Sequence, residues 1–417
     1  MNPKVSVIIP CYNAEKFIGE CLDSVVNQTL TDIEIICVDD GSTDDTNAIL
    51  NDYAKKDKRI TVLRQINSGA GVARNKGLNI ATGEYLSFLD CDDVFETEML
   101  DKMYQTAQKE DLDIIVCRAD SFDNRNKSKE IIQWSIREDL LPKNRPFSGI
   151  EMDKNFYFTF VWWPWDKLYK KSYIDSLGIN FQALRTTNDM FFVASAMVSA
   201  KNVDFIQDVL VHHRVGVKSS LENTREKSWN CFCQALVKVR QYLIDNNLYE
   251  RFQQDFVNYT LHFSFWHLDT LHGYAYAQLY EALRKEWYKE LGLANRDKDY
   301  FYNEKEYERL QGILTTDLGQ HLCDRIDDFF ARNEKLTNDN EELKNKLERT
   351  ETDLQKNWAE LQATRTELQV TRTELQATQA ELQAIVNSKA FKLGTAIAKP
   401  WRCLRDTISP RRKDKSD

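Results

Sequence analysis

The sequence lacks the features that mark several large classes of protein. No apolar run approaches the roughly 18 residues of a membrane-spanning helix, and the first residues lead directly into a strand-like segment without the layout of a signal peptide. The nine cysteines are odd in number, scattered and without a C-x-x-C pair, which argues against a disulfide framework and a zinc knuckle. We therefore expect a protein of the reducing cytosol that is neither secreted nor membrane-spanning.

Two phosphate-binding motifs are missing as well. No G-x-G-x-x-G follows the first expected strand, and no G-x-x-x-x-G-K-[ST] occurs anywhere in the chain. Redox chemistry with a dinucleotide and phosphoryl transfer of the P-loop kind therefore lack their phosphate cradles.

The body of the chain lacks a net positive charge, whereas its end is basic. The net charge is −9, but residues 389–417 carry nine Lys and Arg against three Asp, a net charge of +6, so the remainder carries −15. An acidic body does not invite nucleic acid, and we expect no such partner. A short basic end can attract an anionic membrane surface.

Short apolar runs alternate with segments of helical spacing in the first part of the chain. With 417 residues and 42% hydrophobic side chains, the chain is long enough for one large α/β domain with additions. The expected strands cover residues 5–9, 33–38, 60–63, 85–89 and 112–116, and the expected helices include 14–26, 69–81 and one capped by Ser42 or Thr43. This alternation predicts a Rossmann-like, mostly parallel sheet with helices on both faces.

The expected strand 85–89 leads directly into Asp90, Asp92 and Asp93, three carboxylates within four residues. Like charges this close raise each other's pKa unless a cation compensates them, so the economical interpretation is a divalent metal site at the carboxyl end of a strand. Oxygen ligands favour Mg or Mn. Taken alone, such a motif can also be an acidic turn that ends a strand in solvent.

Polar loops follow several of the expected strands. Ligands of such sheets bind outside the carboxyl ends of the strands, which is where Tyr12, Asp39, Asp40 and residues 67–74 fall together with the acidic turn. This convergence favours the metal site. Tyr12 can lie against a base and Asp40 can accept an N–H from it, although a lone Asp after a strand is also a common helix cap.

Four motifs resemble those of family 2 glycosyltransferases, which have the GT-A fold. In order, they are VSVIIPCYN at 5–13, VDDGSTD at 38–44, the segment 67–75 that contains Asn67-Ser68-Gly69 and Ala73-Arg74-Asn75, and the segment 83–93. The resemblance implies that a nucleoside-diphosphate sugar binds at these loops. It implies that Tyr12 and one or both of the adjacent acids Asp39 and Asp40 contact the base of this donor, and that Pro10 belongs to the same nucleotide-sugar site. It also implies that Arg74 lies near the diphosphate and that Asp90 and Asp92 bridge nucleotide and metal.

An aromatic segment at 161–169 is similar to the family's Trp-x-Lys-Leu segment, with Asp166 where Asn is more usual. It follows residues 118–150, a polar stretch that we interpret as a variable excursion. The rings of Trp163 and Trp165 can form a platform for the acceptor sugar or an aromatic cluster at the edge of the core.

The pair Asn188-Asp189 begins another helix. An Asp in a first turn is ordinarily a cap favoured by the helix dipole. The resemblance instead implies that Asp189 is the general base, because the family has a Glu-Asp pair at this place; Asn188 stands where the family has Glu.

Residues 203–206 and 209–211 are expected to form two strands, and the second leads into His212, His213 and Arg214. Such side chains at a strand end can be surface polar groups. In the family this region returns to the active site, which implies that Arg214 neutralises diphosphate and that one histidine, for which we take His212, completes the coordination of the metal.

The second half of the chain is expected to be helical. Amphipathic helices are predicted from Ser228 onward, and His262, His267 and His272, spaced by five residues, face different directions on a helix and are better explained as structural than as a metal set. Leucines recur every seventh residue from Leu347 to Leu382, which is a coiled-coil period. The positions three residues after them are mostly Thr, so a solvated single helix and a loose homo-oligomer both stay open.

The basic end has an amphipathic pattern of its own. Residues 389–408 place Leu393, Ile397 and Trp401 on one helical face among Lys and Arg, with Pro400 forcing a break. We expect this tail to attach the protein peripherally to the inner face of the cell membrane. A basic tail without a target is the alternative.

The expected domains are a GT-A domain at 1–220, a helical extension at 221–332, a coiled-coil helix at 333–386 and the tail at 387–417. We interpret the chain as an inverting, metal-dependent glycosyltransferase that uses a nucleoside-diphosphate sugar, preferably a UDP-sugar, and a glycan or lipid-linked acceptor. A sugar-nucleotide pyrophosphorylase would need a Gly/Arg-rich loop with a Lys near the first strand, which residues 5–13 lack. A non-catalytic scaffold that senses sugar nucleotides and recruits partners through the coil is the alternative from another class.

Overall fold

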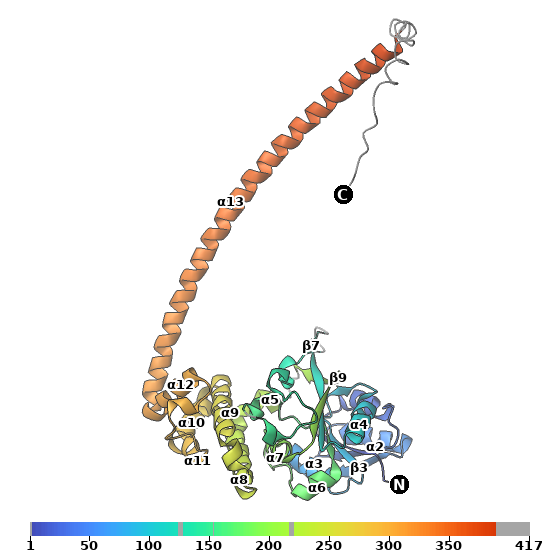
Figure 1. The fold of residues 1–417 in the computed structure, drawn as a ribbon, viewed down its shortest axis with the longest axis vertical. Coiled ribbons are helices and arrows are strands. Elements are labelled where there is room, and N and C mark those ends of the chain that lie inside the picture. The colour runs from blue at the N-terminus through green and yellow to red at the C-terminus, as the bar shows by residue number, and fades with distance from the viewer. Residues whose placement is uncertain (1, 124–127, 153, 217–220, 389–417) are drawn as a thin grey trace. The chain divides into compact units, whose positions relative to one another are not determined.

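The structure is a computed structural model that describes residues 2–123, 128–152, 154–216 and 221–388. The chain forms two compact units, Met1–Leu322 and Cys323–Asp417. The first holds the sheet and the shorter helices (Figure 1). The second consists, where it is described, of most of one long helix.

Four parallel strands form the first part of the sheet. They are β1 (Val5–Cys11), β2 (Ile33–Asp39), β3 (Ile60–Arg64) and β4 (Tyr85–Phe88), in the order β3-β2-β1-β4. The helices between them are α1 (Ile18–Val26), α2 (Thr46–Lys56) and α3 (Ala70–Leu78). The four strands predicted from apolar runs are thus confirmed, because such runs suit a strand that is covered on both faces.

The start of α2 differs from the prediction. Its N-cap is Asp45, and neither Ser42 nor Thr43 caps it. The hydroxyl of Ser42 accepts from the main-chain N–H of Asn13 at 3.0 Å, and the main-chain N–H of Thr43 donates to the side chain of Asn13 at 2.8 Å. These two residues therefore join the loops after β1 and β2 instead of starting the helix.

The second part of the sheet corrects the expectation of a mostly parallel arrangement. In the described residues nine strands form one mixed sheet, and β8 (Lys167–Lys170) runs antiparallel between β4 and β6 (Ile114–Asp123). Next come β9 (Val203–Val215), parallel to β6, and the antiparallel β5 (Val94–Phe95), while β7 (Lys129–Ile131) pairs with β6. The two strands predicted at 203–206 and 209–211 are one, because β9 accommodates its extra residues between Phe205 and Val211 as bulges opposite Val116–Ala119 of β6.

Helices cover both faces of this sheet, as predicted. Alternate residues of a strand point to opposite faces, so Val7 belongs to one core cluster with α1, α2 and α4 (Met99–Lys109), while Ile8 belongs to the other with α3, α6 (Lys171–Leu177) and α7 (Met190–Ser199). Short helical segments precede β8: three 3-10 turns at Gln133–Ser135, Glu138–Leu140 and Gly149–Glu151, and α5 (Phe156–Thr159).

The predicted helical extension is present and shares the second of these cores. It comprises a 3-10 segment (Leu221–Ser228), α8 (Cys231–Asp245), α9 (Tyr249–Thr270), α10 (Gly273–Ala282), a π-helical turn (Leu283–Trp287), α11 (Tyr288–Glu290), a 3-10 turn (Lys298–Tyr300) and α12 (Glu304–Thr315). Leu236 of α8 and Phe256 of α9 lie in the same cluster as Ile8. The extension is therefore packed as part of the first unit.

The histidines of the extension serve packing, in agreement with the structural interpretation. His262 lies 2.8 Å from Glu306, and the ring of His267 stacks on Phe232 with centroids 3.8 Å apart. His272 is the N-cap residue of α10. The described residues contain no group of three or more His, Cys, Asp or Glu side chains arranged to hold a metal ion by themselves.

The predicted heptad segment lies on α13 (Leu318–Asn387), a single helix within which the expected boundary between residues 332 and 333 falls. The part of the chain that the structure describes contains no helix both long and apolar enough to cross a membrane. The amphipathic tail expected at 389–408 lies outside the described residues.

Candidate active site

The loops after the parallel strands meet at their carboxyl ends. Cys11 of β1 is in register with Asp39 of β2, and the main-chain N–H of Asp40 donates to the Cys11 carbonyl at 2.8 Å. Gly41, with φ of 75°, lies so close to the third loop that a Cβ there would be 2.8 Å from the main-chain nitrogen of Asn67. The three loops are thus in direct contact.

Asp39 and Asp40, the two predicted base ligands, anchor these loops. Asp39 is fully buried, accepts from the main-chain N–H of Ser42 at 2.9 Å and pairs with Arg64 at 3.1 Å. Asp40 is 3% exposed. Its carboxylate accepts from the main-chain N–H groups of Ser68 and Gly69, both at 2.8 Å, and from the side chain of Gln65. Asp39 also accepts from the side chain of Asn47 at 3.0 Å, so each carboxylate has three partners, and one of its roughly four acceptor positions remains.

Tyr12 is the exposed aromatic of this edge. Its side chain is 49% exposed, whereas Pro10 is buried within β1, paired with Val38. The ring of Tyr12 is thus accessible to a planar ligand, and Pro10 shapes the strand beneath it.

The acidic turn after β4 holds Asp90, Asp92 and Asp93 close together. Burial, followed by the charges of Asp93 and Asp90, raises the pKa of Asp92 to about 7, against the charge of His213. Burial also raises the pKa of Asp93. Negative charge is therefore under-compensated here, an observation that fits a divalent cation held by Asp90 and Asp92 with further oxygens from water or a diphosphate.

His213, and not His212, is the histidine beside these aspartates. Its Nδ1 lies 3.0 Å from Asp93, and its ring stacks on Trp165 with centroids 5.2 Å apart. Burial alone would lower the pKa of His213, but the charge of Asp93 and its hydrogen bond outweigh burial and raise it to about 9.

His212, which the sequence predicts to complete the metal site, contacts two other carboxylates. Its Nδ1 lies 2.7 Å from Asp120 and its Nε2 lies 2.8 Å from Glu96. Both ring nitrogens are therefore occupied by carboxylates outside the acidic turn. His212 and His213 are neighbours on β9, and neighbouring side chains of a strand point to opposite faces.

Arg74 joins the acidic turn to the segment that carries Asp189. Its guanidinium donates to Asn188 Oδ1 at 2.8 Å and lies 2.5 Å from Asp90 Oδ1. The side chain of Arg74 is 5% exposed, against 30% for Asp90. A Cβ on Gly71, one turn earlier on α3, would lie 2.2 Å from the carbonyl of Gln182, so α3 packs directly on this segment.

Asp189 occupies the N-cap position of α7, but its side chain makes no capping hydrogen bond. The main-chain N–H groups of Asp189 and Met190 do act on its carboxylate, so the alternative of a structural role at the start of the helix stays open. Burial raises the pKa of Asp189, with the charge of Arg74 opposing and that of Asp90 adding to the effect. The carboxyl is thus a stronger base than a solvated Asp, which suits proton abstraction near neutral pH.

Arg214 is buried, and its side chain contacts the acidic turn and helix α1. Its side chain is 1% exposed and lies 2.6 Å from Glu20 of α1. Its Nε donates to the carbonyl of Asp92 at 2.7 Å, and its main-chain N–H donates to Asp93 at 2.8 Å. These partners hold the guanidinium on the acidic turn, while its Nη1 has no hydrogen-bond partner among the described residues, so the expected contact with the diphosphate stays a prediction.

The tryptophan segment is partly core. Trp165 is 2% exposed and stacks between His213 and Trp163, an arrangement that favours the aromatic cluster, the second of the two predicted alternatives. Trp163 is partly buried and meets the edge of Trp134, whose side chain is 60% exposed. Lys167, fully buried, donates to the carbonyls of residues 161 and 163 and so holds the loop in place.

Sequence reasoning missed several of these contacts. Asp93, Glu20 and Asn188 hold His213, Arg214 and Arg74 respectively, and Trp134 is the exposed ring of the aromatic segment. Of these residues, only Asp93 could have been recognised from the local sequence, because it is the third acid of the run Asp90, Asp92 and Asp93. Glu20 and Arg214 are 194 positions apart.

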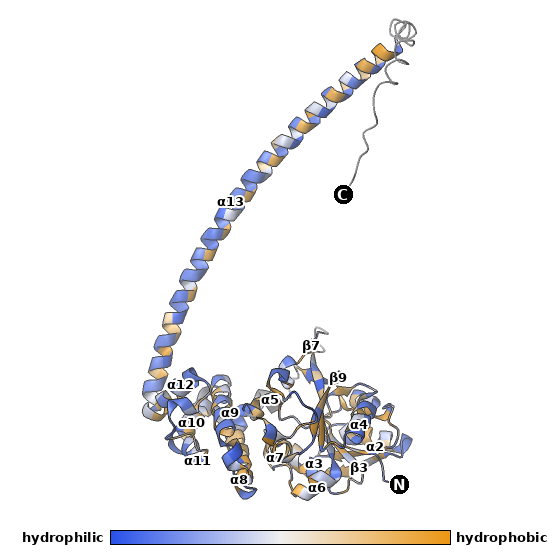
Figure 2. Cartoon of the chain, viewed as in Figure 1, coloured by the Kyte–Doolittle hydropathy of each residue, from blue (hydrophilic) through white to orange (hydrophobic). Residues whose placement is uncertain are grey.

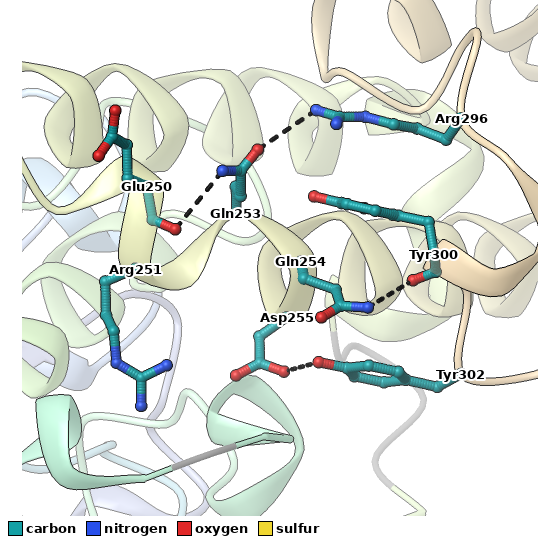
Figure 3. A pocket seen from close by; sticks show the side chains of 8 residues that line it. All are labelled: Glu250, Arg251, Gln253, Gln254, Asp255, Arg296, Tyr300 and Tyr302. Carbon is teal, nitrogen blue, oxygen red and sulfur yellow. Dashed lines mark hydrogen bonds between the residues drawn. The ribbon is translucent and has the colours of Figure 1, made fainter.

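A separate polar pocket of about 310 Å³ lies on the helical extension (Figure 3). Its lining residues come from the start of α9 and from the segment before α12, and Asp255 there accepts from the hydroxyl of Tyr302. Arg251 donates to the carbonyls of Ile150 and Met152, so this side chain ties α9 to the sheet side of the unit. None of the residues predicted from sequence to bind or react lines this pocket.

The match to a family model covers the loops after β1 to β4 and ends before Asp189. The family model Glycosyl transferase family 2 matches residues 6–178. The chain is similar to EpsH of Bacillus subtilis (strain 168), which carries the name of a glycosyltransferase, with 31% identity over 288 residues, 68% of this chain and 82% of EpsH. It is 36% identical over 210 residues to the poly(ribitol-phosphate) beta-glucosyltransferase of Bacillus spizizenii, 49% of this chain and 31% of that protein.

Among solved structures, the chain is similar to residues 1–349 of TarS from S. aureus. The TM-score is 0.54 at 24% identity, covering 67% of this chain and 79% of that one. At this identity the likeness concerns the fold alone, which is the GT-A-like α/β fold.

Proposed function

Because the chain belongs to glycosyl transferase family 2, we propose that it is an inverting, metal-dependent glycosyltransferase. Its donor is a nucleoside-diphosphate sugar, preferably a UDP-sugar, and its acceptor is a hydroxyl of a surface glycan or of a lipid-linked precursor. The observation that carries this proposal is the pair of contacts made by Arg74, which connects the acidic turn to the segment of Asp189. The donor bound at the acidic turn and the general base at Asp189 would then lie at the same site.

In an inverting single displacement the acceptor hydroxyl attacks the anomeric carbon while the bond to the diphosphate breaks. We assign the general base to Asp189, which takes the proton of the attacking hydroxyl. Its raised pKa, caused first by burial, supports this role because the carboxylate then holds the proton more firmly.

Tyr12 is assigned to the base of the nucleotide because its ring is half exposed beside the loops that Asp39 and Asp40 anchor. Asp40, which is 3% exposed and has an acceptor position left, is the acid that we assign to an N–H of the base.

Asp90 and Asp92 are assigned to Mn or Mg. The cation would supply charge stabilisation for the departing diphosphate. The support is the crowding of carboxylates that raises the pKa of Asp92, together with the small number of protein ligands, since Mg commonly takes one or two carboxylates and completes its shell with water and substrate phosphates.

The proposed class of acceptor is supported by the name of one relative. The B. spizizenii relative acts, by its name, on poly(ribitol phosphate), a polymer of hydroxyl-bearing units, but this chain spans only 31% of it. Trp163 and Trp134 are the aromatic side chains that we assign to the acceptor side, since Trp134 offers an exposed face next to Trp163.

A donor-hydrolysis assay tests the proposal. The full chain is incubated with UDP-, GDP- and dTDP-sugars with Mn, with Mg and with a chelator, and release of nucleoside diphosphate is followed. Slow, metal-dependent hydrolysis of one donor is expected. Binding of a donor without any turnover, with or without candidate acceptors, would favour the non-catalytic sensing scaffold instead.

The location we propose is the cytoplasmic face of the cell membrane, held by the basic tail 387–417. Its support is the charge of +6 that residues 389–417 carry on an otherwise acidic chain. Sedimentation with anionic vesicles, compared between the full chain and a chain ending at residue 386, tests this part. Equal sedimentation of the two would overturn it.

A further inference from the structure

The helix α13 carries apolar side chains that lie in solvent in the single chain. None of its residues is buried, and the leucines that recur every seventh residue from Leu347 to Leu382 are 57–70% exposed. Figure 2 shows hydrophobic bands along a helix that is otherwise hydrophilic. A seven-residue period keeps an apolar seam facing a second helix as the two supercoil.

The seam can be written as a heptad abcdefg, with Leu347 and its repeats at position a. In the same frame, position d is Leu at 336 and 343 and Ile at 385, but Thr or Asn from 350 to 378, so there the leucines at position a supply the apolar contact. Asn333 and Asn340 fall at position a. An Asn at position a pairs with its equivalent across a parallel coil and fixes both the register and the number of strands, at a cost in stability. The two asparagines therefore point to a two-stranded arrangement of identical helices.

The charges beside the seam point the same way. In a parallel pair in register, position g of one helix faces position e of the next heptad in the other helix. Four such pairs are opposite in charge between two copies of this chain: Asp339 with Lys344, Lys346 with Glu351, Glu360 with Arg365, and Glu367 with Arg372. No g and e positions paired in this way between 339 and 386 bring two like charges together. Lys346 also pairs with Glu342 on its own helix, at 2.6 Å.

Other arrangements of the same helices bring like charges together. An antiparallel pair sets g against g, and every g position from 353 to 381 is Asp or Glu. A slip by one heptad sets Asp339 against Glu351 in one direction and Lys346 against Lys344 in the other. The charge pattern thus opposes the alternatives as well as favouring one pairing.

We propose that α13 pairs with the α13 of a second copy of this chain as a parallel, in-register, two-stranded coiled coil over residues 333–386. The proposal is independent of the sugar-transfer reaction. Residue 322 of both copies then lies at the same end of the coil, so each dimer carries two complete first units. For an enzyme acting on a polymer, two linked sites raise the effective concentration of the second site once the first is bound.

The mass of the full chain in solution tests the partner. Light scattering after size-exclusion chromatography, over a dilution series, is expected to give twice the 48.8 kDa of one chain. The variant Leu361→Glu/Leu368→Glu places charge in the seam and should shift the mass to that of one chain. The matched control Thr366→Glu/Thr373→Glu adds the same charges at the outward position f and should remain a dimer.

Three results would overturn the proposal. They are a single-chain mass for the unaltered protein throughout the series, a mass of three or more chains, and an equal response of the seam and control variants. The first would mean that the seam stays solvated or meets a different molecule.

Charge exchange tests the orientation and the register. Arg365→Glu/Arg372→Glu and Glu360→Arg/Glu367→Arg each turn two kinds of attractive pair repulsive, so each should raise the dissociation constant of the dimer by about tenfold or more. Mixing the two variants restores opposite charges and should restore a dimer, now of one chain of each. If each variant alone dimerises as tightly as the unaltered chain, the parallel in-register pairing is wrong.

Discussion

The guanidinium of Arg74 lies 2.5 Å from the carboxylate of Asp90 and, through its other nitrogen, 2.8 Å from the amide oxygen of Asn188. One buried cation thus holds the acidic turn after β4 and the residue next to Asp189. Because Asn188 is neutral, the ion pair of the Arg74 guanidinium in this arrangement is the one with Asp90.

Replacing Arg74 by Lys tests this connection. Lys keeps the charge but offers no planar fork, so it cannot hold Asn188 and Asp90 together. Hydrogen bonds to charged groups contribute about 1.5–3 kcal/mol each, so we expect kcat/KM of donor hydrolysis to fall by about ten- to a hundredfold. Steady-state kinetics with the preferred donor measure it.

Asn188→Ala removes one of the two contacts of Arg74 and leaves its ion pair with Asp90. Its loss of kcat/KM should therefore be smaller than that of Arg74→Lys. A larger loss would assign Asn188 a contact of its own with substrate.

Asp92→Asn tests the metal ligand. The amide keeps the shape but loses the charge, so Mn-dependent nucleotide binding should weaken while the fold is retained. Calorimetric titration of nucleoside diphosphate with and without Mn gives the comparison. Asp52→Asn, on the exposed face of α2, is the control and should bind as the unaltered chain does. Unchanged Mn-dependent affinity of Asp92→Asn would remove Asp92 from the site.

Asp189→Asn separates chemistry from binding. A general base acts in the transition state, so transfer should fall by roughly 100- to 10,000-fold with donor affinity nearly unchanged. Single-turnover transfer and equilibrium donor binding are measured side by side. Activity above about a tenth of the original would be too high for loss of a base and would point to another residue in that role.

His267 predicts a pH-dependent stability of the helical extension. Burial, with the charge of Arg225 added, lowers its pKa to about 3 in the folded chain, against 6.5 for an unperturbed His. Above pH 6.5 the residue is neutral in both states. As the pH falls from 6.5 toward 3, His267 is protonated in the unfolded chain but not in the folded chain. The free energy of unfolding therefore decreases, by about 2 kcal/mol at pH 5.

The variant His267→Phe, which keeps the stack on Phe232, should therefore show a shallower loss of stability between pH 6.5 and pH 4.5 in urea unfolding. His262 gives a contrast of opposite sign. Its hydrogen bond with Glu306 raises its pKa, so it adds stability below pH 6.5 that is lost as the pH rises through the raised value. Identical pH profiles for His267→Phe and the unaltered chain would contradict the assignment.

The parts of the fold predicted correctly are those with a strong local signal. The strands β1, β2 and β4 are apolar runs buried on both faces, the edge strand β3 is partly exposed, and the four motifs lie at the ends of these strands and in the loops after them. The antiparallel β8 has only four residues, Lys167–Lys170, and its place between β4 and β6 is decided by pairing partners far along the chain. No local pattern indicates such a partner.

The contacts around the site that the sequence did not predict have the same cause. To choose between His212 and His213, one must know which of them points to the face of the sheet that carries the acidic turn. The sequence predicted a break near residue 207, whereas β9 is one continuous strand. His212 then faces Asp120, in a stretch interpreted as a variable excursion. Burial of Arg214 depends on Glu20, a partner on the first helix that sequence spacing does not reveal.

The shared core of the sheet and the helical extension determines which piece of this chain can be exchanged between proteins. Ile8 of β1, Phe256 of α9 and Ile313 of α12 belong to one buried cluster. A chimera joined near residue 220 would cut that cluster and expose apolar surface on both halves. A junction after Leu322 instead cuts the chain within a solvated helix. Residues 1–322 are therefore the unit to exchange, in engineered chimeras as in recombination between genes, when the specificity of the enzyme is to change.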